Sequence, residues 1–130
     1  MNLGGTVRGI GVDACDVQRM RDSLARTPTM RTRLFTDGEL ADLAGRADPA
    51  PGFAARFAAR EAVMKAMGLG LGAFGFHDVS VRRAESGAPS LIVSGAAQRL
   101  AGERGIDTWH LSLTHTDTVA IAMVVATGAR

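Results

Sequence analysis

Residues 53–72 read FAARFAAREAVMKAMGLGLG, a helical pattern that runs directly into alternating glycines. Its large apolar residues, Phe53, Phe57, Met64 and Met67, fall on one stripe of a helical wheel. Alanines cover most of the remaining surface, so this helix is expected to be enclosed by other elements on most sides. The glycines that follow predict that helix 53–67 stops near Gly68 and passes into a turned or flexible loop.

Two charged residues, Glu61 and Lys65, lie one helical turn apart along the edge of the apolar stripe. An enclosed charge is costly unless it is paired or bound to a metal, so both residues need either each other or a ligand. The ordinary interpretation is an i,i+4 ion pair that contributes about 0.2–0.5 kcal/mol. The alternative is a ligand site, and the helix by itself leaves both open.

The segment VRGIGVDAC, residues 7–15, alternates apolar with small side chains and predicts a strand whose glycines allow close backbone approach. Asp13 lies near the end of this strand. It is either a cap for the helix that follows or a functional carboxylate, and Asp16 is the better candidate for the cap.

The rest of the chain predicts short helices and two hairpins. We expect a helix from Asp16 that Pro28 interrupts, a short helix within 33–45 capped by Thr36 or Asp37, a loop over 46–52, a hairpin with strands 78–83 and 89–94, a helix over 95–105, and a second hairpin with strands 108–115 and 118–126. This order indicates an α+β fold, with a mostly antiparallel sheet packed against the long buried helix.

Length and composition predict a single globular domain over residues 1–130. A hydrophobic content of 46% and only four prolines are typical of a folded chain rather than a disordered one. The start, MNLGGTVRG, lacks the apolar core of a signal peptide, and the longest apolar run, AIAMVVA, is too short to cross a membrane. Together with a single cysteine, Cys15, these features predict a cytoplasmic protein without a membrane partner.

The charge balance argues against a nucleic-acid-binding domain. The sequence has 15 Lys and Arg against 13 Asp and Glu, a net charge of only +2. No aromatic residues that could stack on bases lie near the arginines of the first predicted helix. We therefore expect no nucleic acid partner.

Five segments, in this order, resemble the short form of holo-acyl-carrier-protein synthase, a 4′-phosphopantetheinyl transferase. They are GIGVD (9–13) with Arg19, FTDGEL (35–40), RFAAREAVMKAMG (56–68), GAPSLIVSGAA (87–97) and SLTHT (112–116). Any one of these matches would be weak, but their conjunction covers nearly the whole chain.

The resemblance implies a reaction and its partners. Members of this family transfer phosphopantetheine from coenzyme A to a serine hydroxyl of apo-acyl carrier protein, with Mg²⁺ on the pyrophosphate, and release adenosine 3′,5′-bisphosphate. Short members assemble as homotrimers with active sites between subunits. Whether the carrier serves fatty acid or polyketide synthesis is left open by the sequence.

The resemblance also implies roles for individual residues. Asp13 and Glu61 match the metal ligands, which suits Mg²⁺ because it takes one or two carboxylates with phosphate oxygens and water. Lys65 matches the lysine that faces the phosphates. The coenzyme A contacts carried over are Arg56, Lys65, His115 and Thr116, with the last two contributed across a subunit boundary. Gly68 and Gly70 are added as coenzyme A contacts because glycines there can bring backbone N–H groups close to a phosphate without a Cβ in the way. Arg19 and Arg26 match the basic face offered to the carrier protein.

Simpler interpretations of these residues remain open at this point. The glycines can be only a helix stop, His115 can sit in a polar turn, and the arginines can form a solvated face. His77 and His110 are assigned to structure. The proton acceptor for the serine is also open, with a water held by Asp13, Glu61 or the metal preferred.

One residue departs from the family pattern. Arg60 stands before Glu61, where lysine is most common in the family. The guanidinium of arginine is planar and forked, so any contact made there would differ in geometry from a contact made by lysine. This departure keeps a second hypothesis alive, a catalytically silent homologue that binds coenzyme A or a carrier protein without reaction.

Overall fold

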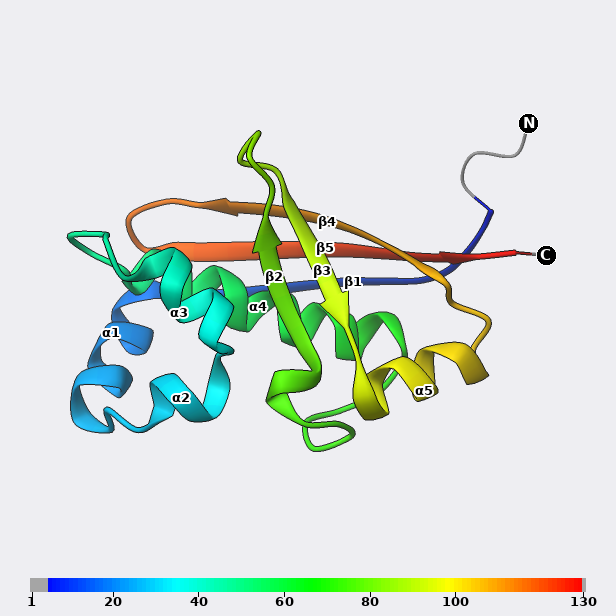
Figure 1. The fold of residues 1–130 in the computed structure, drawn as a ribbon, viewed down its shortest axis with the longest axis horizontal. Coiled ribbons are helices and arrows are strands. Elements are labelled where there is room, and N and C mark those ends of the chain that lie inside the picture. The colour runs from blue at the N-terminus through cyan, green and yellow to red at the C-terminus, as the bar shows by residue number, and fades with distance from the viewer. Residues whose placement is uncertain (1–4, 130) are drawn as a thin grey trace.

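The computed structural model describes residues 5–129. Its elements are β1 (Thr6–Asp16), α1 (Val17–Arg26), α2 (Met30–Leu34), α3 (Asp37–Leu43), α4 (Ala50–Ala66), the 3₁₀ turn η1 (Phe76–Asp78), β2 (Val79–Arg83), β3 (Pro89–Val93), α5 (Gly95–Glu103), β4 (Thr108–His115) and β5 (Val119–Gly128). The strands form a three-stranded sheet in the order β1-β5-β4 and a separate hairpin of β2 and β3 (Figure 1). All of these pairings are antiparallel, so the α+β expectation is confirmed.

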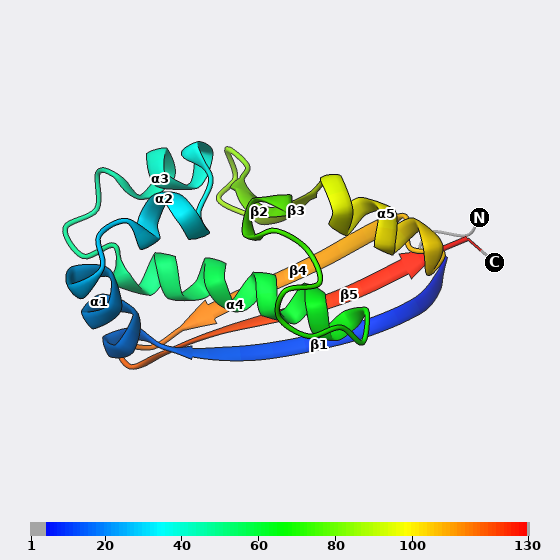
Figure 2. The same cartoon turned by 90° about the horizontal axis from the view of Figure 1, so that it is seen from below.

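The long helix α4 lies between two layers. Figure 2 shows the three-stranded sheet on one side of it, and α2, α3, the β2-β3 hairpin and α5 on the other. Thirteen of its seventeen residues are buried, so the enclosure expected from the alanines around its apolar stripe is confirmed. Residues of α4 belong to both apolar clusters of the fold, so this helix connects the two halves of the core.

The start of α4 corrects one expectation. The sequence predicts a loop over 46–52 because of its two prolines, but the helix already begins at Ala50 and contains Pro51 in its first turn. Proline is tolerated there because the first N–H groups of a helix have no partner within the helix. The end of the helix is as expected, since Gly68 has a φ of +70° and donates its N–H to the carbonyl of Lys65.

Two glycines of β1 bring this strand directly onto α4. A Cβ on Gly9 would overlap the carbonyl oxygen of Ala66, and one on Gly11 would overlap that of Ala62. Glycine is therefore required at both positions by the close approach of two backbones. The contact fixes where the next inward-facing residue of the strand, Asp13, meets the helix.

The first helices are held by side-chain caps. Asp16 accepts a hydrogen bond from the N–H of Arg19 at 2.8 Å and caps α1, which confirms it over Asp13. Thr36 and Glu39 form a capping box at the start of α3. Neither α2, a helix of five residues, nor η1 is predicted by the sequence, because such short segments carry little periodic signal.

Both predicted hairpins are present in the structure. Val79 pairs with Val93 and Val81 with Leu91 in the β2-β3 hairpin. In the sheet, the buried alanines of β5 face α4, while Val12 and its partner Met123 lie on the opposite face. That outer face is apolar and exposed, with Val7, Ile10, Val12 and Met123 between 48% and 65% accessible. In the described part of the chain, no helix is long and apolar enough to cross a membrane.

Candidate active site

The centre of the candidate site is the contact between β1 and α4. Lys65 Nζ lies 2.9 Å from Asp13 Oδ1 and also donates a hydrogen bond of 3.2 Å to the carbonyl of Val12. The lysine is 54% exposed and the aspartate 18%, so the ammonium group reaches the carboxylate from the solvent side. The predicted site residues Asp13 and Lys65, 52 positions apart in sequence, are thus brought into direct contact.

Glu61 faces the same place from the preceding turn of α4. Partial burial raises the pKa of its carboxyl group, the negative charge of Asp13 raises it further, and Lys65 opposes the shift. The charge of Asp13 therefore acts on Glu61 here, and Lys65 lies near both carboxylates. An ordinary i,i+4 pair does not describe this arrangement, because Lys65 bonds across to the strand.

This donor set fits an incomplete magnesium site. No group of three or more His, Cys, Asp or Glu side chains that could hold a metal occurs among residues 5–129. Two neighbouring carboxylates suit a divalent cation, and Mg²⁺ completes its coordination with water and phosphate oxygens. Asp13 and Glu61 are the residues that would hold such an ion.

A pocket of about 290 Å³ opens beside Asp13. Its walls include Cys15 and Arg19 from the β1-α1 segment, and Met20, Met30 and Phe57 supply apolar surface. Burial raises the pKa of the Cys15 thiol to about 11, and the nearby Asp13 and Asp16 carboxylates add to the shift. The thiol is therefore protonated at neutral pH and is no candidate nucleophile.

The glycine loop after α4 has room for a ligand. A Cβ at Gly68, Gly70 or Gly72 would meet nothing within 4 Å in this chain. The positive φ angles of Gly68 and Gly72 require glycine for the turn, but Gly70 has no such requirement. Neither packing nor backbone conformation within the described chain requires glycine at Gly70.

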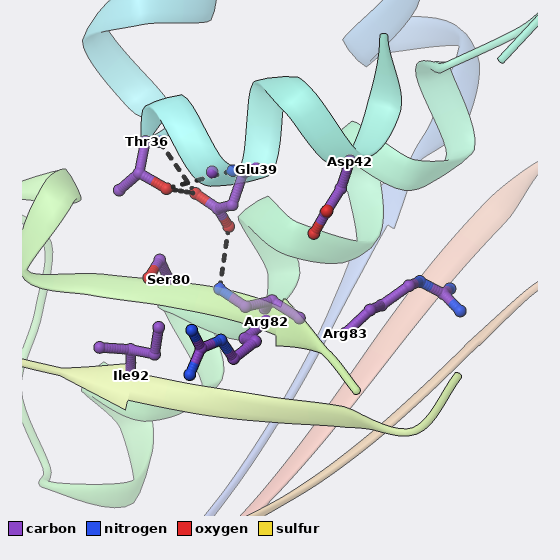
Figure 3. A pocket seen from close by; sticks show the side chains of 9 residues that line it. Thr36, Glu39, Asp42, Ser80, Arg82, Arg83 and Ile92 are labelled. Carbon is purple, nitrogen blue, oxygen red and sulfur yellow. Dashed lines mark hydrogen bonds between the residues drawn. The ribbon is translucent and has the colours of Figure 1, made fainter. Parts of the chain in front are cut away.

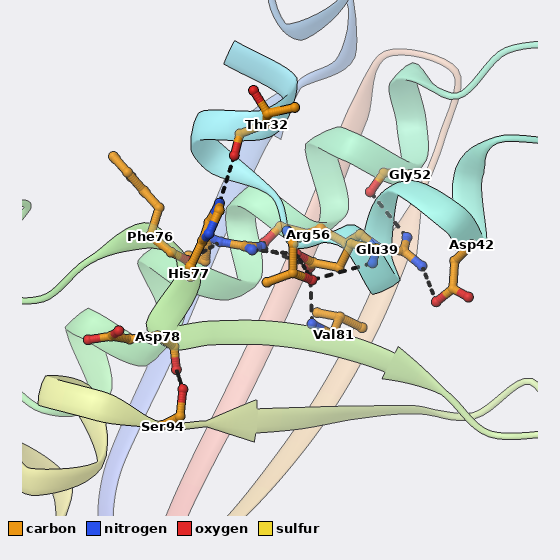
Figure 4. A network of polar contacts seen from close by, with 12 residues as sticks. Thr32, Glu39, Asp42, Gly52, Arg56, Phe76, His77, Asp78, Val81 and Ser94 are labelled. Atoms are coloured by element: carbon orange, nitrogen blue, oxygen red, sulfur yellow. Dashed lines mark hydrogen bonds and ion pairs between the residues drawn. The ribbon is translucent and has the colours of Figure 1, made fainter. Parts of the chain in front are cut away.

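Arg60, the residue that departs from the family pattern, is buried away from Asp13 and from the carboxylate of Glu61. Its guanidinium forms a forked ion pair with Glu39, including an Nη1–Oε2 contact of 2.9 Å, and both side chains are at most 1% exposed. Arg60 Nε donates to the carbonyl of Phe76, and Glu39 also accepts the N–H of Val81. This network, drawn in Figure 4, joins α4 to α3, η1 and β2. Arg60 is a structural residue here.

Arg56 lies one turn before Arg60 and is equally enclosed. Its Nη1 donates to the carbonyl of Gly52 at 3.3 Å, and its Nη2 lies 3.8 Å from Asp42 (Figure 4). Two of its nitrogens, Nε and Nη2, have no hydrogen-bond partner among the described residues. Five helical positions separate Arg56 from Glu61, so the two side chains point about 140° apart around the helix.

Asp42 also lines a second pocket, of about 230 Å³, between α3 and the β2-β3 hairpin. Figure 3 shows Asp42 beside Arg82 and Arg83 there, with Ser80 and Ile92 on the strands. This pocket is on the Arg56 side of α4 and does not include Asp13, Glu61 or Lys65. The two pockets share no lining residue.

His115 and Thr116 are not brought to the carboxylates within one chain. They lie at the end of β4, and β5 separates β4 from β1 in the sheet. Cys15 and His115 both pair with Ala120, so His115 is two strands, or roughly 10 Å, across from the start of α1. His115 is exposed, and its Nδ1 contacts only the carbonyl of Thr116 among the described residues.

The arginines of α1 divide into two kinds. Arg21 is held by Asp48 at 2.6 Å and by Gln18. Arg19 and Arg26 are exposed, and within residues 5–129 their side chains form no ion pair or hydrogen bond. Only the latter two have a free charge for a partner.

Comparison with known proteins identifies the family. The family model of the 4′-phosphopantetheinyl transferase superfamily matches residues 9–124. A holo-[acyl-carrier-protein] synthase from Frankia casuarinae is 48% identical over 120 residues, which cover 92% of this chain and 97% of the relative. The crystal structure of holo-ACP-synthase from Plasmodium yoelii has a TM-score of 0.86 at 26% identity and covers 98% of this chain and 100% of its own.

A further solved structure was determined with a ligand. It is a holo-(acyl-carrier-protein) synthase from Bacillus anthracis in complex with CoA (3′,5′-ADP), with a TM-score of 0.79 at 30% identity, covering 96% of this chain and 100% of that one. The chain belongs to the 4′-phosphopantetheinyl transferase superfamily and, within it, to the holo-acyl-carrier-protein synthases. The enzyme class and the fold expected from the five motifs are confirmed.

Proposed function

We propose that residues 1–130 act as one transferase domain that moves the phosphopantetheine arm of coenzyme A to a serine of an apo-acyl carrier protein. The observation that carries the proposal is the meeting of Asp13, Glu61 and Lys65 at the contact of β1 with α4. The similarity to holo-acyl-carrier-protein synthases supports the substrates, since a relative was solved with coenzyme A. The released product is adenosine 3′,5′-bisphosphate.

The proposed chemistry assigns a task to each residue. Asp13 and Glu61 hold Mg²⁺, which supplies charge neutralisation on the pyrophosphate when bound. Lys65 faces the phosphates, and the N–H groups near Gly68 and Gly70 approach them where a side chain would obstruct. The serine oxygen forms a bond to the β-phosphorus while the bond to the leaving 3′,5′-bisphosphate breaks. A water held by Asp13 or Glu61 takes the serine proton.

The coenzyme A and carrier contacts extend this site in two directions. We assign Arg56, two of whose nitrogens lack a hydrogen-bond partner among the described residues, to the nucleotide end of coenzyme A. Arg19 and Arg26 face the acidic carrier, and the pocket between Asp13 and Arg19 lies on the path from that surface to the carboxylates. Complementary charge of this kind acts mainly on the rate of encounter.

The active form is proposed to be a homotrimer in which His115 and Thr116 of one subunit complete the site of another. The exposed apolar face of the three-stranded sheet supports this proposal, because monomers rarely leave such a surface uncovered. The separation of His115 from Asp13 within one chain is consistent with a contribution from a neighbour. A cytoplasmic location follows from coenzyme A and a carrier protein as substrates.

Intact-mass spectrometry of a carrier protein tests the function. An apo-acyl carrier protein is incubated with coenzyme A and this protein, with Mg²⁺ or with EDTA, and one phosphopantetheine adduct is expected only with the metal. The silent homologue predicts bound coenzyme A and no adduct with any carrier. The burial of Arg60 against Glu39 favours the active enzyme, because the arginine in place of lysine does not contact Asp13 or the carboxylate of Glu61.

A further inference from the structure

Lys65 is chemically exceptional in this chain. The fifteen basic residues are fourteen arginines and this one lysine. A lysine carries a compact charge on a flexible stem, whereas arginine presents a rigid planar fork that holds its partners in a fixed geometry. The only basic residue that is not an arginine is thus the one in contact with Asp13. A flexible side chain with a compact charge can exchange one anionic partner for another at this position.

Within residues 5–129, the carboxylates next to Lys65 form no ion pair with any other basic residue. Of the ion pairs within residues 5–129, the Lys65 contact alone involves Asp13, and Glu61 takes part in none. Glu61 lies near enough to Asp13 and Lys65 for both charges to act on its pKa. Among residues 5–129, Lys65 is therefore the only cation that forms an ion pair with either of these two carboxylates.

This position conflicts with the proposed bound state. A divalent cation on Asp13 and an ammonium group 2.9 Å from the same carboxylate repel each other strongly at such distances. The pyrophosphate of coenzyme A offers the lysine another anion. Because Lys65 is 54% exposed and its two hydrogen bonds reach only Val12 and Asp13, the side chain can leave without unpacking the core.

We propose that Lys65 is a displaceable internal counter-ion, and that it couples the binding of the divalent cation to the binding of coenzyme A. The pyrophosphate draws Lys65 away from Asp13 and so opens the carboxylate to the metal, while the metal releases Lys65 to the pyrophosphate. Each ligand must then raise the affinity of the other by the same factor. The inference rests on the proposed function, because it takes Asp13 and Glu61 as the metal ligands.

Mn²⁺ binding, followed by electron paramagnetic resonance without any carrier protein, tests the coupling. In the wild type, Mn²⁺ alone should bind weakly and saturating coenzyme A should tighten it. Lys65→Met should bind Mn²⁺ alone about tenfold or more tightly than the wild type, and coenzyme A should then tighten it by a smaller factor. Lys65→Arg keeps the charge and should stay close to the wild type in the absence of coenzyme A.

Arg99→Met is the matched control, since it removes one positive charge at an exposed position of α5. It should leave both Mn²⁺ affinities unchanged. Equal Mn²⁺ affinity of the wild type and Lys65→Met, or an equal coenzyme A effect in both, would overturn the role of Lys65 while leaving the metal site in place. No Mn²⁺ binding even with coenzyme A would overturn the proposed metal site as well.

A second readout follows the side chain itself. Because the chain has one lysine, protein labelled with ¹³C at lysine Cε gives a single NMR signal for Lys65. Its shift in the free wild type should differ from that in Asp13→Asn, and coenzyme A should move it in the wild type. The same shift in Asp13→Asn, or no response to coenzyme A, would contradict the exchange.

Discussion

Gly11 of β1 packs against Ala62 of α4 so closely that a Cβ on the glycine would overlap the alanine carbonyl oxygen. This contact sets the distance between the strand that carries Asp13 and the helix that carries Glu61. The position of the carboxylate pair therefore depends on a residue that has no side chain and takes no part in chemistry.

Gly11→Ala should force β1 away from α4. We expect a loss of about 1–3 kcal/mol in the free energy of unfolding, the usual cost of overpacking, and a larger proportional loss of transfer activity because Asp13 moves from Glu61. Urea denaturation and the intact-mass assay measure the two effects. Gly102→Ala is the control, since nothing lies within 4 Å of the added Cβ and the site is helical, so stability should be kept or slightly raised. An active, stable Gly11→Ala protein would contradict the packing argument.

The Glu39–Arg60 pair should make stability depend on acid pH. Burial alone would raise the pKa of Glu39, but the hydrogen bond and charge of Arg60, with the N–H groups of Thr36 and Val81, prevail and lower it. The folded state then binds fewer protons than the unfolded state between the two pKa values. The stabilisation is present above the unfolded pKa of about 4.3 and is lost as pH falls through the lower folded value.

Glu39→Gln should remove this acid dependence and cost roughly 3–5 kcal/mol near neutral pH, because Arg60 loses its buried counter-charge. Urea unfolding at a series of pH values from 3 to 7 gives both quantities. Glu85→Gln, which removes an exposed carboxylate from the hairpin turn, should change neither. A Glu39→Gln protein whose stability falls with acid as steeply as that of the wild type would show that the pair is not the source.

Arg19 and Arg26 should affect the carrier protein and leave coenzyme A binding unchanged. Each substitution to Met should raise the carrier KM roughly two- to fivefold, as expected for about 0.4–1 kcal/mol from an exposed charge pair. The effect should shrink at high salt because such charges are screened. Arg21→Met is the control, since Arg21 is already paired with Asp48. If Arg21→Met raised the carrier KM as much as Arg19→Met and Arg26→Met, the effect would come from net charge alone and would contradict a specific carrier surface at Arg19 and Arg26.

Met123 tests the proposed assembly. It lies on the outer face of the sheet, 48% exposed and paired with Val12. Met123→Lys should convert trimers to monomers at micromolar concentration, because buried like charges would meet between subunits, and transfer should be lost with them. Light scattering after size exclusion reports the mass. Ile92→Lys makes the same chemical change on the separate hairpin and should remain trimeric. A trimeric Met123→Lys protein would place the interface elsewhere.

Local patterns in the sequence were enough to predict most elements. The close backbone approach at the β1 glycines, the cap at Asp16 and the β2-β3 hairpin all follow from neighbouring residues and are confirmed. The predicted start of α4 was wrong because prolines are typical of loops as well as of the first turn of a helix, and the local sequence does not separate the two. Short α2 has too few turns to show a period.

The candidate site was predictable only in part. The resemblance selected Asp13, Glu61 and Lys65, and the fold brings them together. The resemblance did not explain why arginine replaces lysine at position 60. Its partner Glu39 lies 21 positions earlier, and local sequence alone indicates only a helix cap for Glu39. The bond from Lys65 to Asp13 was also missed, because the nearer Glu61 is the obvious partner on a helical wheel. Contacts between distant segments decide both cases.

Transfer by Glu61→Gln tests the central claim most directly. The substitution removes a charge that burial and Asp13 both disfavour, so the fold and its melting temperature should be kept or improved. Intact-mass measurement of an apo-acyl carrier protein with coenzyme A and Mg²⁺ should then show a rate lower by at least about a hundredfold, the usual scale for losing a group that stabilises transition-state charge. A folded Glu61→Gln protein that modifies the carrier at the wild-type rate would contradict the account.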